Sequence, residues 1–304
     1  MRGVFVDANG SLADIFERQS KPGNPPARVN RNPDITPEQI PALLDGAEIV
    51  VIDHTALPID IARQCSGLKH VVFLGTGARS YMNPEELAEL GIAVHLIKGY
   101  GDTAVAECAI ALMWAAARGI AKMDREMRAG NWLREDGMQL TGKTLGLIGF
   151  GGLAAEVARI ALGSGMKVIA WNRSPKQFAG IEFVSLDALL VQSQVVSLHL
   201  LLNDETRGFL SRERINAMKP GVILVNTARA AVVDEAAMIE ALKSGHIRHA
   251  GLDVFSTEPL PADHPLTKIP NVTLSAHSAF RTPEASENLI HAAWEHCRRI
   301  AKGG

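Results

Sequence analysis

The first hundred residues alternate short apolar runs with longer segments that carry apolar residues at helical spacing. This alternation predicts a parallel β-sheet covered by helices on both faces. The expected strands are 3–6, 49–52, 71–74 and 92–95. Thr36 and Asn83 each precede a proline and are expected to cap helices, and Gln39 completes a capping box with Thr36. The segment 20–33 is rich in Pro, Gly, Asn and Arg, which predicts a surface loop.

The same alternation of predicted strands and helices continues in the second part of the chain. A long alanine-rich helix is expected from Asp102 toward Arg128, and its small side chains suit close packing at a domain or subunit interface. A further helix is expected over 235–243, capped by Asp234 and ended by Gly245. The further buried strands are expected at 145–148, 167–171, 195–200, 222–226, 250–254 and 272–275.

A glycine turn lies between the strand 145–148 and the helix that follows it. Its sequence is Gly149-Phe150-Gly151-Gly152-Leu153-Ala154. Gly149 suits the tight turn, Gly151 lets a pyrophosphate approach the backbone, and Ala154 lets the helix pack close to the strand. The N–H groups at the start of the helix would face the phosphates. Because the strand 167–171 completes a βαβ unit, the turn predicts dinucleotide binding.

These elements predict an α/β protein with two domains, each a parallel sheet flanked by helices. A Rossmann dinucleotide-binding domain over 99–282 is expected to be inserted in a flavodoxin-like substrate domain formed by 1–98 and 283–304. The last helix, opened by Thr282, is expected to return to the N-terminal domain. Its apolar face carries Leu289, Ala292, Ala293 and Cys297. Ligands in such sheets bind at the carboxyl ends of the strands, so we expect the site in the cleft between the domains.

Composition and charge narrow the class of protein. The 304 residues are 47% apolar and 21% charged, with 31 basic and 33 acidic residues and a net charge of −2. No nucleic-acid or membrane partner is expected from this balance. Cys65, Cys108 and Cys297 match no disulfide or metal pattern and predict reduced thiols in a cytoplasmic protein. The N-terminus lacks the apolar run of a signal peptide, and the longest apolar stretch is too short to span a membrane.

The end of the second strand of the βαβ unit indicates which dinucleotide binds. NAD-binding units place a carboxylate there for the ribose 2′-hydroxyl. This chain has Asn172-Arg173-Ser174 instead. Arg173 and Ser174 can bind a 2′-phosphate, and Asn172 does not repel it. We therefore expect NADP(H) as the preferred cofactor, with NAD(H) as the alternative, although the same residues could form an ordinary solvated turn.

Three polar residues follow strands of the second half and are candidates for catalysis. Arg229 follows 222–226, Glu258 follows 250–254 and His277 follows 272–275. Each alone has an ordinary structural explanation, as a surface arginine, a loop carboxylate or a satisfied histidine. Because they follow strands of one sheet, they can converge at its carboxyl edge. No metal site is expected.

Several motifs in order along nearly the whole chain resemble the D-2-hydroxyacid dehydrogenase family, in its glyoxylate/hydroxypyruvate reductase-like branch. The motifs are 99–107 (GYGDTAVAE), 140–146 (LTGKTLG), the glycine turn, 226–229 (NTAR), 233–235 (VDE), 251–255 (GLDVF), Glu258-Pro259 and His277. The resemblance implies catalytic roles for Arg229, Glu258 and His277. Arg229 would bind the carboxylate of a 2-oxo acid and polarise its carbonyl, His277 would act as general acid or base, and Glu258 would orient His277.

The resemblance also implies a set of binding residues. Asp253 would contact the carboxamide of the nicotinamide. The implied cofactor-binding residues are Thr103, Gly149, Phe150, Gly151, Gly152, Leu153, Asn172, Arg173, Ser174, Leu200, Thr227, Ala228, Arg229, Asp253 and His277. The implied substrate-binding residues are Leu74, Gly75, Thr76, Gly77, Arg229 and His277, although Gly75-Thr76-Gly77 could be a plain strand-ending turn.

The chain departs from the family pattern at a few positions near the expected substrate. Ala276 replaces a proline usual before the histidine, and Gly77 is followed by Ala78-Arg79-Ser80. Arg79 and Arg281 could line the substrate pocket or be solvated. Phe73 stands where phosphoglycerate-using members commonly carry an arginine, which disfavours a phosphorylated substrate.

We weigh four functions. The first is an NADP(H)-dependent oxidoreductase that interconverts a small 2-oxo acid, such as glyoxylate or hydroxypyruvate, and the D-2-hydroxy acid. The second is a dinucleotide-sensing, corepressor-like interaction protein, which the complete Arg/Glu/His set disfavours. The third is a D-3-phosphoglycerate dehydrogenase-like enzyme that uses NAD. A formate dehydrogenase-like enzyme is disfavoured because that branch pairs its histidine with glutamine. The alanine-rich helix favours a homodimer.

Overall fold

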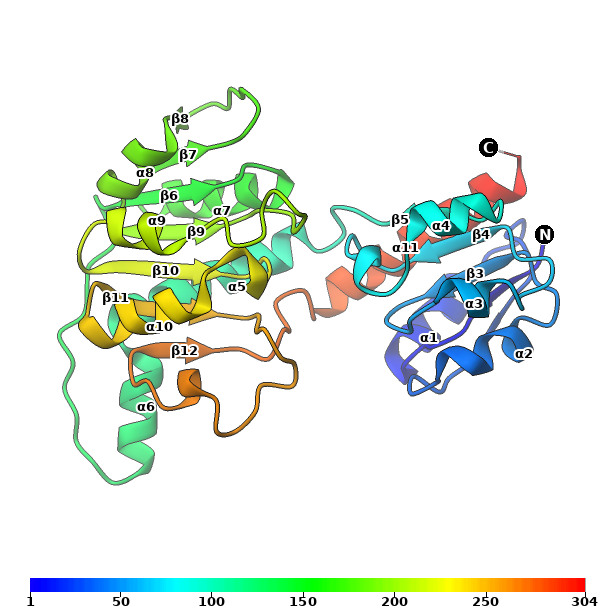
Figure 1. The fold of residues 1–304 in the computed structure, drawn as a ribbon, viewed down its shortest axis with the longest axis horizontal. Helices are drawn as coiled ribbons and strands as arrows, with labels where there is room; N and C mark the ends of the chain where they lie inside the picture. The colour runs from blue at the N-terminus through cyan, green and yellow to red at the C-terminus, as the bar shows by residue number, and fades with distance from the viewer. Residues whose placement is uncertain (304) are drawn as a thin grey trace. The chain divides into compact units, whose positions relative to one another are not determined.

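The computed structural model describes residues 1–303 and divides the chain into two compact units (Figure 1). The smaller unit consists of residues 1–101 together with the end of the chain from Arg281, and the larger unit is 102–280.

The smaller unit contains a sheet of five parallel strands. The strands are β1 (Gly3–Phe5), β2 (Ala27–Val29), β3 (Ile49–Ile52), β4 (His70–Phe73) and β5 (Ala93–Leu96). Their order, β2-β1-β3-β4-β5, is the flavodoxin-like order. The expected fold class of this unit is confirmed.

Helices cover both faces of the smaller sheet, as its buried apolar strands require. One face is covered by α2 (Ile40–Leu44), α3 (Ile59–Ala62) and α4 (Pro84–Glu89), and the other by α1 (Gly10–Arg18) and α11 (Pro283–Ala301). Trp294 of α11 stacks on Phe16 of α1 at 4.2 Å between ring centroids, and its indole N–H donates to the Phe16 carbonyl at 3.0 Å. The expected return of the last helix to the N-terminal sheet is therefore confirmed.

The larger unit contains a sheet of seven parallel strands. They are β6 (Thr144–Ile148), β7 (Lys167–Trp171), β8 (Glu182–Phe183), β9 (Val195–Leu198), β10 (Val222–Asn226), β11 (Ile247–Leu252) and β12 (Val272–Leu274). The order is β12-β11-β10-β9-β6-β7-β8. The chain starts in the middle at β6, extends to β7 and β8, and returns to add β9 on the other side of β6. This reversal is the Rossmann arrangement, and it creates a switch point between β6 and β9.

Helices pack on both faces of this larger sheet (Figure 1). α5 (Asp102–Arg118) and α7 (Gly152–Gly163) cover one face, and α8 (Leu186–Gln192), α9 (Arg212–Ala217) and α10 (Glu235–Ser244) cover the other. α6 (Ile120–Arg128) follows α5 and buries none of its residues. Four short 3₁₀ helices complete the described elements: Pro37–Gln39, Ala78–Ser80, Ala230–Val232 and Pro265–Thr267.

The predicted caps form the expected hydrogen bonds. The Asn83 side chain accepts from the Glu85 and Glu86 amides, and Asp234 accepts from the Ala237 amide at 3.0 Å. The Thr36 amide donates to the Gln39 side chain at 2.9 Å, as a capping box requires.

Two expectations from the sequence were wrong. The segment 20–33 is not only a loop, because β2 forms an edge strand there, and three residues are too few to show a periodicity. The helix from Asp102 is not continuous to Arg128, because it ends at Arg118. Gly119 has a left-handed φ of 61°, and α6 continues at an angle of 66° to α5.

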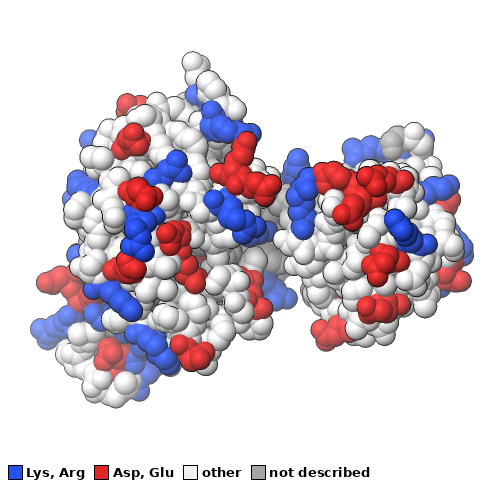
Figure 2. All heavy atoms as spheres, viewed as in Figure 1, with Lys and Arg blue, Asp and Glu red and all other residues white. Residues whose placement is uncertain are grey.

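Within the described residues, no single helix is long and apolar enough to cross a membrane. α5 and α6 reach the required length and composition only as a bent pair. Basic and acidic side chains are interspersed over the face of the larger unit shown in Figure 2.

Candidate active site

The candidate cofactor residues of the larger unit lie at the carboxyl edge of its sheet or at the start of α5. Because the strands are parallel, the segments that follow them meet at one edge. Gly149 to Leu153 follow β6, Asn172 to Ser174 follow β7, and Leu200 follows β9. Thr227 to Arg229 follow β10, Asp253 follows β11 and His277 follows β12, while Thr103 lies in the first turn of α5. The fold therefore brings these segments to one edge of one sheet.

The glycine turn has the geometry that its sequence predicts. Gly149 has a φ of 87°, and a Cβ on it would lie 2.5 Å from the carbonyl oxygen of His199. A side chain at this position is therefore excluded twice, by conformation and by space. A Cβ on Gly151 would meet nothing within 4 Å, so the backbone is open on this side. No side-chain hydrogen bond caps the start of α7 at Gly151, and the Asp102 carboxylate lies beside Gly152, where an added Cβ would overlap with it.

The segment after β7 is tied to the glycine turn and carries two cations. The Asn172 side chain accepts from the Phe150 amide at 3.1 Å, and Lys176 Nζ donates to the Phe150 carbonyl at 2.5 Å. Arg173 is exposed and forms an ion pair with Glu205, which lies in the segment after β9. Lys176 and Glu205 were not among the residues predicted from the sequence.

His277 and Glu258 form a close pair. His277 Nδ1 lies 2.6 Å from Glu258 Oε2, and the other carboxylate oxygen of Glu258 accepts from the Phe255 amide at 2.9 Å. The carboxylate is thus held at both oxygens, and it fixes the orientation of the imidazole ring. The side chains are 39% and 35% exposed, so the pair is accessible to a small molecule. With Nδ1 engaged, Nε2 is the ring atom available for proton transfer.

The backbone of His277 is held in an unusual conformation by Asp253. His277 has a φ of 48°, in the left-handed region that few residues other than glycine adopt. The carboxylate of Asp253 is buried, and its two oxygens accept from the Ser278 and Ala279 amides at 3.0 Å each. These two bonds hold the segment that follows the histidine.

Arg229 is positioned by the last residue of β10. The Asn226 side chain accepts from the Ala228 amide and donates to the Arg229 carbonyl, both at 3.0 Å. The Arg229 guanidinium donates to the Ala228 carbonyl at 2.6 Å and forms no ion pair with a carboxylate among residues 1–303. It therefore retains donors for an anionic ligand.

Two further side chains at this edge carry buried polar atoms that have no hydrogen-bond partner among residues 1–303. They are the hydroxyl of Thr227, a predicted cofactor residue, and both ring nitrogens of His199. Burial lowers the pKa of His199 to about 4, so its ring is neutral at physiological pH. Orphaned buried polar groups are rare and are typical of a site that takes a polar ligand. The sequence signal for His199 was only its place directly after a strand.

The predicted substrate segment of the smaller unit follows β4. Leu74 is buried and its amide donates to the Ile52 carbonyl at 2.8 Å, and the Gly75 carbonyl accepts from the Ile97 amide. Thr76 is exposed, and within the described chain neither its amide nor that of Gly77 has a hydrogen-bond partner. Arg79 forms an ion pair with Glu85.

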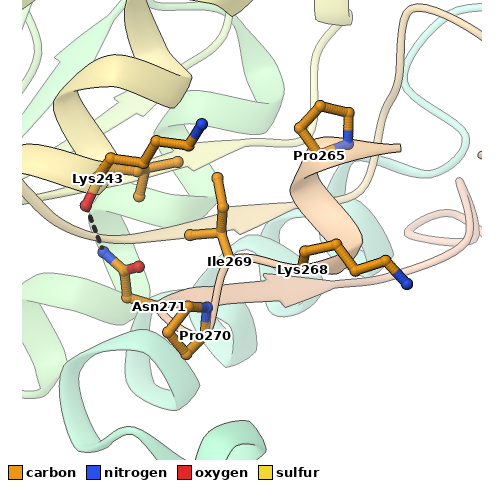
Figure 3. Close-up of a pocket in the computed structure, with 7 residues that line it drawn as sticks. Lys243, Pro265, Lys268, Ile269, Pro270 and Asn271 are labelled. Atoms are coloured by element: carbon orange, nitrogen blue, oxygen red, sulfur yellow. Dashed lines mark hydrogen bonds between the residues drawn. The ribbon is translucent and has the colours of Figure 1, made fainter. Parts of the chain in front are cut away.

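A cavity of about 390 Å³ lies at the opposite, amino edge of the larger sheet. It is lined by Leu242, Lys243, Pro265, Lys268, Ile269, Pro270 and Asn271, and Asn271 donates to the Leu242 carbonyl at 3.1 Å (Figure 3). None of the predicted site residues lines it. Among residues 1–303 no group of three or more His, Cys, Asp or Glu side chains is arranged to hold a metal ion.

The Rossmann sheet, the open glycine turn and the His277–Glu258 pair together define a nicotinamide-dinucleotide-dependent oxidoreductase. Residues 110–279 match the model of the D-isomer specific 2-hydroxyacid dehydrogenase NAD-binding domain. The chain therefore belongs to the D-2-hydroxyacid dehydrogenase family.

Individual relatives resemble the chain over most of its length. A hydroxypyruvate reductase of Thermotoga maritima is 40% identical over 79% of this chain and 80% of the relative. A glyoxylate reductase of Aeropyrum pernix is 38% identical over 80% of this chain and 76% of the relative. An acyclic imino acid reductase solved with NADPH and D-Arg superimposes with a TM-score of 0.82 at 28% identity, covering 96% of this chain and 94% of that one.

Replacing Asp253 by Asn tests its hold on the His277 segment. The substitution exchanges one acceptor for an NH₂ group that faces a backbone N–H. We expect the free energy of unfolding to fall by about 1–3 kcal/mol and hydrogen exchange at Ser278 and Ala279 to accelerate. Urea denaturation and amide exchange measure the two effects.

Asp234→Asn is the matched control, because Asn caps a helix as well as Asp does. It should leave both measurements unchanged. Wild-type stability and wild-type exchange in Asp253→Asn would contradict the role assigned to Asp253.

Proposed function

We propose that the protein is an NADP(H)-dependent reductase that converts a small 2-oxo acid, such as glyoxylate or hydroxypyruvate, to the D-2-hydroxy acid, and that also catalyses the reverse reaction. The observation that carries this proposal is the 2.6 Å contact between His277 and Glu258 at the edge that also holds the glycine turn. The family membership supports the reaction class, and the two reductases named above support the choice of substrates.

The proposed catalytic set uses the ends of three adjacent strands. Arg229, after β10, would bind the substrate carboxylate and polarise the neighbouring carbonyl through its unoccupied donors. His277, after β12, would donate a proton from Nε2 to the carbonyl oxygen as negative charge develops there. Glu258, after β11, would stabilise the imidazolium through Nδ1. In the reverse direction, Nε2 of His277 would accept the proton.

The bound nicotinamide would supply the hydride, and the larger unit offers residues to hold the dinucleotide. The start of α7 would face the pyrophosphate, and Thr103, Leu200, Thr227, Ala228 and Asp253 would surround the nicotinamide side. Each carboxylate oxygen of Asp253 keeps a second lone pair for the carboxamide. The positions of these residues at the sheet edge and in the first turn of α5 support these roles, and so does the family resemblance.

The preference for the phosphorylated cofactor rests on the end of β7. Asn172 leaves no carboxylate there, and Arg173, Ser174 and Lys176 provide donors for a 2′-phosphate. The structural relative that was solved with NADPH supports this choice.

The segment after β4 supplies the proposed substrate residues of the smaller unit. We propose that the Thr76 and Gly77 amides, which lack partners in the described chain, bind the substrate carboxylate. Leu74 and Gly75 would position them. In this scheme 1–98 with 283–304 is the substrate domain and 99–282 is the cofactor domain. The three free cysteines support a cytoplasmic location.

Substitution of the catalytic set tests the mechanism. We expect wild-type protein to oxidise NADPH in the presence of hydroxypyruvate or glyoxylate, and faster than NADH at subsaturating cofactor. His277→Asn should lower kcat about 10²–10⁴-fold, because it removes the proton donor. Arg229→Gln should lower kcat/KM about tenfold to a hundredfold, because it removes charged hydrogen bonds. Initial rates over a panel of 2-oxo acids measure these effects.

Cofactor affinity of His277→Asn should stay within about threefold of wild type, which separates lost chemistry from lost folding. Full turnover by both variants would refute the mechanism. Absence of turnover with every 2-oxo acid, together with tight cofactor binding, would favour a dinucleotide-sensing protein.

We also propose that the protein is a homodimer that uses α6 and the segment after it. Ile120, Met127 and Trp132 are 53%, 56% and 75% exposed, and none of them is buried by the described chain. Large apolar side chains gathered on one projecting helix and the adjoining loop are typical of a protein interface. A second copy would cover them by two-fold symmetry.

Sedimentation velocity tests the dimer. We expect a dimer at micromolar concentration for wild type and a monomer for the double variant Ile120→Glu, Trp132→Glu. Val191→Glu alters an equally exposed apolar residue on α8 and should remain dimeric. A monomeric wild type at tens of micromolar would rule out the dimer.

A further inference from the structure

The guanidinium of Arg173, one of the two cations after β7, is not free. It forms an ion pair with Glu205, which lies 32 residues further along the chain. Building on the proposed NADP(H) preference, we propose that Glu205 competes with the cofactor's 2′-phosphate for Arg173. Glu205 then limits the affinity for NADPH without affecting NADH.

Hydrogen bonds fix the backbone around both residues of the ion pair. Asn172, next to Arg173, is bonded to the Phe150 amide and the Ser174 carbonyl. The turn that carries Glu205 is closed by Thr206, whose hydroxyl accepts from the Asn203 amide at 2.8 Å and donates to the Leu201 carbonyl at 2.6 Å. Because neither backbone is loose, a ligand at Arg173 must displace a carboxylate that stays nearby.

Among the described residues, Glu205 forms its ion pair with Arg173 and with no other cation. Lys176 donates to the Phe150 carbonyl and forms no ion pair with a carboxylate in the described chain. Asp204, which precedes Glu205, adds a second negative charge to the turn without pairing with Arg173. Arg173 is therefore the cation at which a carboxylate and a phosphate would compete, and Lys176 is the cation that remains available.

The charges of the 2′-phosphate and of Glu205 determine how the ion pair changes the affinity for NADPH. A 2′-phosphate carries a charge of about −1.5 to −2 at neutral pH, so it attracts Arg173 more strongly than a single carboxylate does. It binds, however, only by breaking the existing pair and by approaching the displaced carboxylate. Arg173 and Glu205 are 75% and 69% exposed, so solvent screening keeps the effect modest. NADH has a neutral hydroxyl at this position, so its binding neither breaks the ion pair nor brings a second negative charge near Glu205.

Equilibrium binding of NADPH and NADH, followed by nicotinamide fluorescence in the absence of substrate, tests the inference. The variants are Glu205→Gln, Arg173→Gln and the double variant. We expect Glu205→Gln to lower the Kd for NADPH about threefold to tenfold, the latter being about 1.4 kcal/mol, and to change the Kd for NADH less than twofold. In the Arg173→Gln background, Glu205→Gln should lower the Kd for NADPH less than twofold.

The matched control is Glu240→Gln. It breaks the exposed Arg212–Glu240 ion pair between α9 and α10 and removes the same charge from the same unit. It should leave both dissociation constants unchanged.

The outcomes separate this inference from the proposed cofactor preference. If Glu205→Gln leaves NADPH binding within twofold of wild type or weakens it, competition is refuted. If Glu205→Gln lowers the Kd for NADPH equally in the Arg173→Gln background, competition is also refuted. Glu205 would then act on the phosphate only as a distant charge. If wild type prefers NADH and Arg173→Gln does not weaken NADPH binding, the NADP(H) preference itself fails.

Discussion

The buried carboxylate of Asp253 fixes the backbone of the segment that follows His277. It accepts the amides of Ser278 and Ala279, the two residues after His277, while His277 itself has a left-handed backbone. A non-glycine residue keeps such a conformation only where its surroundings enforce it. The constraint places the imidazole beside Glu258, which is itself fixed by the Phe255 amide. Asp253, directly after β11, thus holds the segment that follows β12, and the proposed proton transfer depends on this arrangement.

Much of the architecture could be predicted from the sequence because local rules decide it. The strands at Ile49–Ile52, Lys167–Trp171 and Val222–Asn226 match the predicted spans, since a continuous apolar run in a doubly covered sheet has few alternatives. The caps at Asn83 and Asp234 were equally predictable, because a cap is a contact between residues two or three positions apart. The glycine turn was predictable for the same reason.

Features that depend on distant or very short segments could not be predicted from local sequence rules. β2 consists of three residues whose strand character comes from pairing with β1. The bend between α5 and α6 occurs at Gly119, yet glycine within an alanine-rich helix does not by itself specify a break. At the site, the His277–Glu258 pairing was expected from the family resemblance. The contacts of Asp253 with 278 and 279, and of Arg173 with Glu205, join residues that no spacing rule connects.

In the proposed reaction, NADPH transfers hydride to one face of a 2-oxo acid that is held at the strand ends of Arg229, Glu258 and His277. The most direct measurement uses two NADPH samples, each deuterated at C4 on one face, with hydroxypyruvate as substrate. Mass spectrometry and chiral chromatography of the product then report both transfer and configuration. We predict D-glycerate with deuterium at C2 from one of the two samples and none from the other. L-glycerate, or a product without deuterium from either sample, would contradict the claim.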